Sequence, residues 1–202
     1  MNCDIQLTDK LFTYFEEVTK ELGITYIPPC VNRSKATFDV IDGVLVYALG
    51  ALKNVGFEAM NLIVTAREAG GTFREFISLF DFARRVDLRR VGKRPLEMLV
   101  RAGAFDQLDS NRRRIFDGLN GLVRYSIAIH EQQASSQVSL FGEGGDDLPE
   151  PKLPSVTDWL PSERLTEEFK AVGFYLSGHP LDDYMGALRR QNVMTLDELS
   201  EK

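Results

Sequence analysis

The chain has 202 residues, of which 44% are hydrophobic and 27% charged, an ordinary composition that could form one large domain or two small ones. Its formal net charge of −6 argues against a general nucleic-acid binder unless basic residues are concentrated in one region. There is no apolar run of about 18 residues, no basic leader and no cysteine beyond Cys3 and Cys30, so we expect a cytoplasmic protein without a membrane span, secretory signal or disulfide framework.

The N-terminal part of the chain predicts one helix and one β-hairpin. Apolar residues recur at helical spacing between the N-cap signal Thr8-Asp9 and Gly23, which predicts a helix over 10–22. Two β-prone runs, 37–41 and 44–48, flank Asp42-Gly43, a pair that suits a type I′ turn. We therefore expect a small hairpin in the first third of the chain.

The stretch 48–63 is the first candidate for contact with a nucleic acid. Its apolar residues fall three or four apart on both sides of a tight turn, which predicts two short helices. Gly56 can take a positive φ freely, and Asn54 tolerates it better than most residues. Such a turn leaves backbone N–H groups unpaired at the start of the second helix, where a phosphate is best received. We predict contact with the DNA backbone through Lys53, Asn54, Val55 and Gly56, the alternative being an ordinary junction within an all-α core.

Residues 87–103 resemble a second, weaker copy of this pattern. Pro95 suits the first turn of the following helix, and Gly103 suits its end. Two such units would form a compact four-helix module with both turns able to face one DNA backbone. The second turn adds four residues to the predicted DNA contacts, namely Arg90, Gly92, Lys93 and Arg94.

Between the two turns we expect a helix over 57–69 that is closed by Gly70-Gly71. An aromatic and aliphatic cluster follows at mixed spacing, and we assign it to the core rather than to a base-stacking platform. Its members are Phe73, Phe76, Leu79, Phe80 and Phe82.

Charge is segregated along the chain. Residues 84–114 contain ten basic and four acidic residues, whereas residues 143–168 contain eight acidic and two basic ones. This pattern fits a basic DNA-facing part beside an acidic linker. Arginines that merely lie on solvated helix faces would give the same pattern.

The C-terminal half predicts a long helix, a linker and two further helices. Ser110 is the expected cap of a helix that runs to about 134, and Gly118 and Gly121 weaken that helix. Gln, Ser, Gly, Asp and Pro dominate 132–161, which predicts a flexible or extended linker. We then expect Ser162 to cap a helix, and a last helix over 181–190. The inward face of the long helix should carry Ile115, Leu119, Leu122, Ser126 and Ile129, and that of the following helix Leu165, Phe169 and Val172.

Four runs of residues, taken in order, resemble the family of bacterial DNA polymerase III alpha subunits, the C-family replicative polymerases. The resemblance covers nearly the whole chain, and its specificity comes from the combination of the runs. They are Tyr47-Ala-Leu-Gly-Ala-Leu-Lys-Asn-Val-Gly56, Phe80-Asp-Phe-Ala-Arg-Arg-Val-Asp-Leu-Arg89, Lys93-Arg94 through Ala102-Gly-Ala-Phe-Asp106, and Gly173-Phe-Tyr-Leu-Ser-Gly-His-Pro-Leu181.

The resemblance implies a domain organisation. Residues 1–47 would be the end of the fingers domain, with the β-hairpin, and residues 48–134 a tandem helix-hairpin-helix with the long helix. Residues 135–161 would be a linker with a clamp-binding motif, and residues 162–202 helices that lead towards an absent oligonucleotide-binding fold. The expected fold is therefore mainly α, with a tandem helix-hairpin-helix module, a small β-hairpin near the N-terminal third and a linker rich in Pro, Gly and acidic residues.

The resemblance also gives a meaning to an apolar run in the linker. Gln137-Val-Ser-Leu-Phe141 matches the sliding-clamp-binding pattern Gln-x-Ser/Asp-Leu-Phe, at the place where this family carries its internal clamp motif. Leu140 and Phe141 would enter an apolar pocket, while the amide of Gln137 would satisfy polar groups at its rim. The implied clamp-binding residues are Gln137, Ser139, Leu140 and Phe141, and the alternative is a chance apolar patch.

No catalytic residue, metal ligand or cofactor is expected in this chain. The family's parent enzyme is a DNA-directed DNA polymerase that uses Mg²⁺ in a palm domain, and no stretch here could be that palm. His130 and His179 lack partners at ligand spacing. The implied function is that of a non-catalytic fragment, inactive by itself, that contacts the backbone of double-stranded DNA and binds the sliding clamp (beta subunit) beside other holoenzyme subunits, without a membrane. The alternative is a packing domain of the polymerase with no direct DNA contact.

Overall fold

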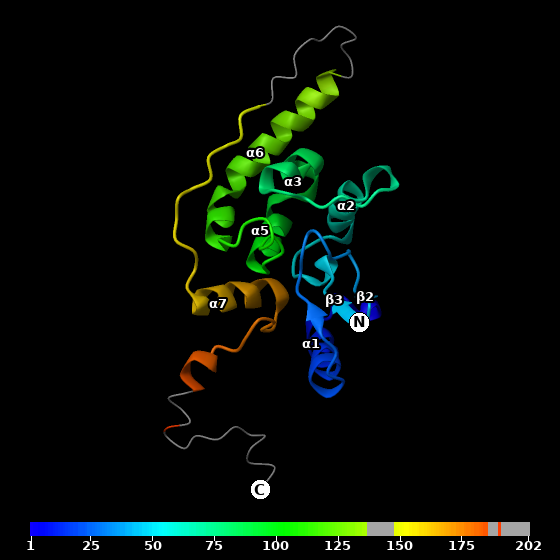
Figure 1. Cartoon of the computed structure of the whole chain (residues 1–202), viewed down its shortest axis with the longest axis vertical. Helices are drawn as coiled ribbons and strands as arrows, with labels where there is room; N and C mark the ends of the chain where they lie inside the picture. The colour runs from blue at the N-terminus through cyan, green and yellow to red at the C-terminus, as the bar shows by residue number, and fades with distance from the viewer. Residues whose placement is uncertain (137–147, 186–189, 191–202) are drawn as a thin grey trace.

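A computed structural model describes residues 1–136, 148–185 and 190 of the chain (Figure 1). The described part is mainly helical with one small sheet, as the sequence predicts. None of its helices combines the length and the apolar composition needed to cross a membrane. Its helices are α1 (Thr8–Glu16), α2 (Phe57–Arg67), α3 (Leu79–Arg85), α4 (Leu88–Val91), α5 (Lys93–Arg101), α6 (Arg112–Ser136) and α7 (Pro161–Val172), and its strands are β1 (Tyr26–Ile27), β2 (Asp39–Ile41) and β3 (Val44–Val46).

The N-terminal helix and hairpin are confirmed. A π-helical turn, Glu17–Glu21, extends α1, so the chain is helical over most of the predicted range. β2 and β3 pair antiparallel, and both residues between them, Asp42 and Gly43, have positive φ (51° and 78°), as a type I′ turn requires. β1 joins β3 in parallel, which gives a mixed sheet in the order β1-β3-β2.

The core is continuous from the sheet to α6, and the predicted aromatic cluster contributes only part of it. Phe76 and Phe82 are buried, and their ring centroids lie 5.0 Å apart. The prediction is wrong for Phe73, which is 55% exposed because it lies in the loop before α3, where its ring covers the guanidinium of Arg67 at 5.4 Å. Phe80 is half-buried against Tyr125.

The long helix α6 buries the face that its sequence predicts. Its cap is different: Ser110 is exposed, and the side chain of Asn111 accepts a hydrogen bond from the N–H of Arg114 at 2.9 Å. All five residues of the predicted face are buried, namely Ile115, Leu119, Leu122, Ser126 and Ile129.

Residues 148–160, the described part of the predicted linker, are extended and follow α6 back to α7 (Figure 1). A Cβ at Gly118 would lie 2.9 Å from Leu153 and 3.2 Å from Pro154, so this glycine makes room for the returning chain. The amide of Asn111 donates to the carbonyl of Val156 at 2.8 Å. The two glycines that weaken α6 intrinsically thus lie on the side where residues 148–160 pack, since Gly121 faces Pro151 in the same way.

Helix α7 departs from its prediction in its cap and in its buried face. Pro161 is its first residue, and the carboxylate of Glu163 accepts from the N–H of Leu160 at 2.9 Å, so Ser162 is not the cap. Of the predicted face, Val172 is buried and Leu165 half-buried, but Phe169 is 42% exposed, and Glu168 and Ala171 are buried in addition. Of the helix predicted over 181–190, the structure describes a 3-10 turn at Asp182–Tyr184, and residues 186–189 lie outside the described ranges.

Candidate nucleic-acid interface

The second predicted turn joins two true helices. α4 ends at Val91, Gly92 adopts φ 90° and ψ 149°, and α5 begins at Lys93. Pro95 is the third residue of α5, where its missing N–H costs no intrahelical bond. The unit is held in place by apolar side chains that are 3% exposed or less: Leu88, Val91, Leu96, Leu99 and Val100.

Positive charge gathers at this turn and remains exposed. The side chains of Arg90, Lys93 and Arg94 all lie at the surface. The ammonium of Lys93 is 3.8 Å from the carboxylate of Glu97, whereas the guanidinium groups of Arg90 and Arg94 form no hydrogen bond or ion pair within the described part of the chain. The first N–H groups of α5 add the positive end of a helix dipole at the same place. The arrangement suits an anion.

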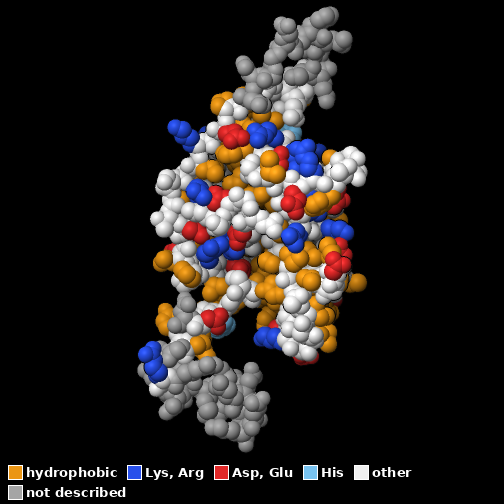
Figure 2. All heavy atoms as spheres, viewed as in Figure 1, with side chains coloured by type: hydrophobic (Ala, Val, Ile, Leu, Met, Phe, Trp, Pro, Cys, Tyr) orange, Lys and Arg blue, Asp and Glu red, His pale blue; other side chains and the backbone are white. Residues whose placement is uncertain are grey.

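Most of the other basic residues in 84–114 form ion pairs within the fold, so little of the positive charge of this segment is free. The acidic segment folds back onto the basic one: Glu150 pairs with Arg84 at 3.0 Å, and Glu167 pairs with Arg101. On the face seen in Figure 2, basic and acidic side chains are accordingly interspersed. Further pairs at 2.6–3.7 Å are Arg85–Asp81, Arg89–Glu131, Arg112–Asp106, Arg113–Asp117 and Arg114–Asp109.

The first predicted turn has a different geometry. A single 3-10 turn, Leu49–Ala51, replaces its first helix. The residue with positive φ is Asn54, at 59°. Gly56 is extended with φ −86°, a conformation that any residue can adopt, so its φ does not require glycine. Val55 is 6% exposed and belongs to the core.

This first turn packs against the end of α7. The N–H of Lys53 donates to the carbonyl of Ala171 at 2.7 Å, and its ammonium lies 5.7 Å from the centroid of the Phe169 ring. The first turn of α2 carries the exposed acid Glu58, which repels phosphate. The first turn is therefore part of a packing contact, and less favourable to an anion than the second.

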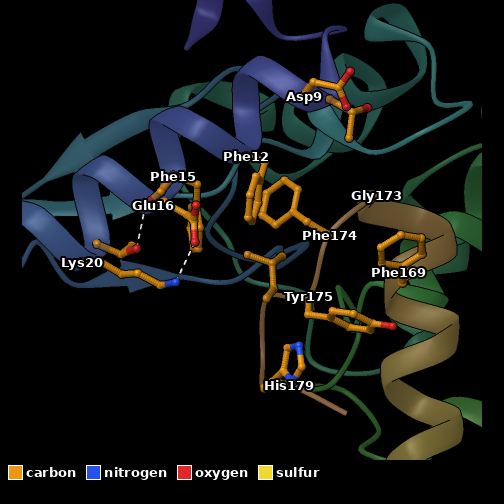
Figure 3. Close-up of a pocket in the computed structure, with 14 residues that line it drawn as sticks. Asp9, Phe12, Phe15, Glu16, Lys20, Phe169, Gly173, Phe174, Tyr175 and His179 are labelled. Carbon is orange, nitrogen blue, oxygen red and sulfur yellow. Dashed lines mark hydrogen bonds and ion pairs between the residues drawn. The ribbon is translucent and has the colours of Figure 1, made fainter. Parts of the chain in front are cut away.

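A groove of about 640 Å³ lies beside this contact, between α1 and residues 169–179 (Figure 3). Phe12 and Phe174 face each other in it with centroids 5.5 Å apart. The carboxylates of Asp9 and Glu16 line its rim, and Lys20 is already paired with Glu16 at 2.6 Å. An aromatic lining with acidic groups at its rim is a poor place for a phosphate.

Glu168 is a structural anchor that the sequence does not reveal. Its carboxylate is 2% exposed and accepts from the N–H groups of Leu176 and Ser177 at 2.7 and 2.9 Å, which ties α7 to the chain that follows it. Burial, with the nearby charge of Glu168, raises the pKa of the Tyr47 hydroxyl well above its usual range. In the sequence Glu168 looks like any acid on a surface helix, because its partners are set by a turn that only the fold defines.

The predicted clamp-binding residues, Gln137, Ser139, Leu140 and Phe141, lie outside the described residues. The described chain on either side of them ends with α6 and resumes at Leu148. Of the predicted contact residues that the structure does describe, those of the second turn form an exposed cationic arrangement and those of the first turn do not.

Comparison with known families finds a helix-hairpin-helix motif over residues 23–115, a range that contains both turns.

Comparison with curated proteins finds relatives that are called DNA polymerase III subunit alpha. The protein from Caulobacter vibrioides is 42% identical over 198 residues, which are 98% of this chain and 17% of the relative. The protein from Vibrio cholerae is 36% identical over 201 residues, again 98% of this chain and 17% of the relative. The protein from Thermus aquaticus is 39% identical over 194 residues, 96% of this chain and 15% of the relative. The chain thus spans about one sixth of the length of these relatives.

Proposed function

Because the chain is homologous, over nearly its whole length, to a segment of DNA polymerase III alpha subunits, we propose that it holds duplex DNA by its backbone and binds a sliding clamp in such a polymerase. It has no catalytic role of its own in this proposal. Its contribution is processivity, since each contact with DNA or with a ring around DNA delays dissociation of the polymerase from the primer end.

The observation that carries the DNA contact is the exposed cationic turn between α4 and α5. The side chains of Arg90 and Arg94 have no partner among the described residues, and that of Lys93 has only Glu97, at 3.8 Å. Contacts to phosphates from such side chains and from helix N-termini fix a protein on a duplex without reading its sequence. Arg90, Gly92, Lys93 and Arg94 form the contact surface in this proposal.

The first turn has a supporting role. Lys53, Asn54, Val55 and Gly56 place the start of α2 and dock on α7 through the hydrogen bond from Lys53 to Ala171. α2 also packs against α4, so the first turn contributes to the stability of the fold that carries the second turn.

The clamp contact rests on the run 137–141. Burial of Leu140 and Phe141 in a groove of the clamp would contribute roughly 3–6 kcal/mol of binding free energy before ordering costs. Once those costs are subtracted, we expect micromolar binding by the isolated run. Gln137 and Ser139 would supply the polar contacts at the rim. Because both contacts belong to one polypeptide, binding at one of them raises the effective concentration of the partner at the other.

We also propose the division into the end of a fingers domain (1–47), a tandem helix-hairpin-helix with the long helix (48–134), a linker with the clamp motif (135–161) and C-terminal helices (162–202). The location proposed is cytoplasmic, and the further partners are the other subunits of a polymerase holoenzyme.

Fluorescence anisotropy with a labelled duplex, with and without clamp, tests this function. The double variant Leu140→Ala/Phe141→Ala should abolish clamp binding and leave DNA affinity unchanged, because the two side chains that enter the pocket are lost while the cationic turn is intact. Unchanged clamp affinity in that variant would contradict the assignment of residues 137–141 as the clamp-binding run. Nucleotide incorporation by the purified chain would contradict the non-catalytic role.

A packing domain that never touches DNA is the second candidate. The observation in its favour is the extensive internal pairing of arginines, from Arg84–Glu150 to Arg114–Asp109, which leaves little free positive charge. The same titration separates the two functions, since a packing domain predicts no salt-dependent DNA binding.

A further inference from the structure

Ser126 is a completely buried polar residue in the middle of α6. Its hydroxyl accepts a hydrogen bond from the N–H of Leu88 at 3.1 Å and donates one to the carbonyl of Val86 at 2.9 Å. These two backbone groups flank Asp87, the N-cap of α4. One side chain on α6 therefore fixes both sides of the point at which α4 begins.

The start of α4 determines where the cationic turn lies. α4 has four residues, too few to hold a direction by its own hydrogen bonds. Arg90 is two residues beyond Leu88, and Gly92 follows directly after the helix. A small rotation at Leu88 therefore moves Arg90 and the start of α5 together.

Neighbouring contacts place further polar groups at the same point of α6. The ring of His130 lies one helical turn beyond Ser126, with its Nδ1 2.8 Å from the carbonyl oxygen of Ser126. The guanidinium of Arg89 pairs with the exposed carboxylate of Glu131 at 3.3 Å. Since the Arg89 pair is exposed, it stabilises little, and the buried hydroxyl is the stronger constraint on α4 because a buried N–H or carbonyl without a partner is costly.

We propose that Ser126 is a positioning residue for the DNA-contacting turn and that it acts through Leu88 and Val86. This role rests on the proposed DNA contact of Arg90, Lys93 and Arg94. Ser126 itself touches no DNA. Its hydroxyl holds α4 in the direction that lets these three cations meet one phosphate backbone.

The test measures duplex affinity of the full 202-residue chain by anisotropy at several salt concentrations for Ser126→Ala, Ser126→Cys and Ser126→Thr. Ser126→Ala should weaken binding about tenfold, because two buried hydrogen bonds that set the direction of α4 are lost. Ser126→Thr keeps the hydroxyl and should restore affinity to within about threefold of wild type. Ser126→Cys, which has almost the size of serine but a weaker hydrogen-bonding group, should fall between them and covers the case in which the alanine variant does not fold.

Ser34→Ala is the matched control. Ser34 is also completely buried, and its hydroxyl accepts from the N–H of Cys30 at 3.0 Å, but it lies in the loop before β2. This variant should lose stability to a similar degree and keep its DNA affinity. Equal losses of affinity in Ser34→Ala and Ser126→Ala would show that only general stability matters, and would overturn the positioning role.

A thermodynamic cycle with Arg90→Gln/Arg94→Gln separates this proposal from the DNA proposal on which it rests. If Ser126 acts through these cations, Ser126→Ala should change affinity less than about twofold in that background. A full tenfold effect there overturns the role of Ser126. If Arg90→Gln/Arg94→Gln removes duplex binding while Ser126→Ala leaves it unchanged, the role of Ser126 is overturned and the DNA contact stands. Absence of salt-dependent binding by the wild-type chain overturns both.

Discussion

The two turns of this chain share a Val-Gly pair, at Val55-Gly56 and Val91-Gly92, and both valines are buried, yet the turns are used differently. In the second turn Gly92 has the positive φ, and the cations beside it are exposed. In the first turn Gly56 is extended, and Lys53 is engaged by α7. The difference teaches that a turn motif defines a local shape, whereas the elements that fold back onto it decide whether that shape is available to a ligand.

The charges around the two turns differ as well. The first turn lies beside the acidic rim of the groove that contains Asp9 and Glu16. Near the second turn Glu131 pairs with Arg89 at 3.3 Å, and Glu97 approaches only Lys93, at 3.8 Å. Free positive charge therefore remains where α4 meets α5, although the first turn also contains a lysine.

Charge reversal at the two turns should give the largest contrast. Arg90→Glu/Arg94→Glu should weaken duplex binding about 1,000-fold at about 50 mM salt, or about 4 kcal/mol, and lower the salt slope by about two, because two phosphate contacts become repulsive. Lys53→Glu should change affinity less than about threefold, because its ammonium lies over Phe169. Anisotropy titrations at several salt concentrations measure both. A larger effect of Lys53→Glu would reverse the assignment of the two turns.

Gly173→Ala should loosen the contact between the first turn and α7. Gly173 has φ 100°, and an added Cβ would lie 2.3 Å from the Thr8 methyl and 2.6 Å from Lys53. We expect a loss of about 3 kcal/mol in the free energy of unfolding, from backbone strain and crowding. Urea denaturation measures this loss, and the folded variant should bind DNA within about threefold of wild type. Wild-type stability would mean that this contact does not support the first turn.

Alanine at the two turn glycines should separate their backbone roles. Gly92→Ala should cost about 2 kcal/mol of stability, because φ 90° with ψ 149° is a conformation that essentially only glycine adopts. Gly56→Ala should change stability by less than about 0.5 kcal/mol, since its φ is ordinary and nothing lies within 4 Å of an added Cβ. Thermal unfolding of the two variants measures both changes in stability. Equal losses of stability would contradict the geometry described for the turns.

Asn54→Gly should have the smallest effect. Asn54 already adopts φ 59°, a value that asparagine tolerates, so glycine relieves little strain and stability should change by less than about 0.5 kcal/mol. If the first turn only supports the fold, DNA affinity should not change. Tighter DNA binding by this variant would indicate that closer backbone approach at the first turn matters, and that it is a phosphate site after all.

Much of the fold could be predicted from local patterns. The buried face of α6 follows from residues three and four apart, and the hairpin follows from Asp42-Gly43 between β-prone runs. The caps do not follow from the sequence: Asn111, and not Ser110, caps α6, and the N-cap of α7 is Leu160, whose N–H is bonded by the carboxylate of Glu163. Several polar residues in a row can each cap a helix, and the choice among them depends on the path of the preceding chain.

The candidate site was predicted only in outline. The second turn, with its glycine and its cations, follows from the sequence, because the residues that form it are consecutive. The roles of Ser126 and Glu168 do not, because the backbone groups that they bind are eight or more residues away and no pattern marks them.

The sequence by itself determined the helical periodicity, the hairpin, the second turn and the resemblance that comparison with relatives confirmed. Only the tertiary structure decided which turn is exposed and which arginines are free. Arg84 meets Glu150 across 66 residues of chain, and Lys53 meets Ala171 across more than a hundred. Local propensity cannot encode such pairs, since they form only when the apolar faces of the helices have packed and brought distant charges and backbone groups together.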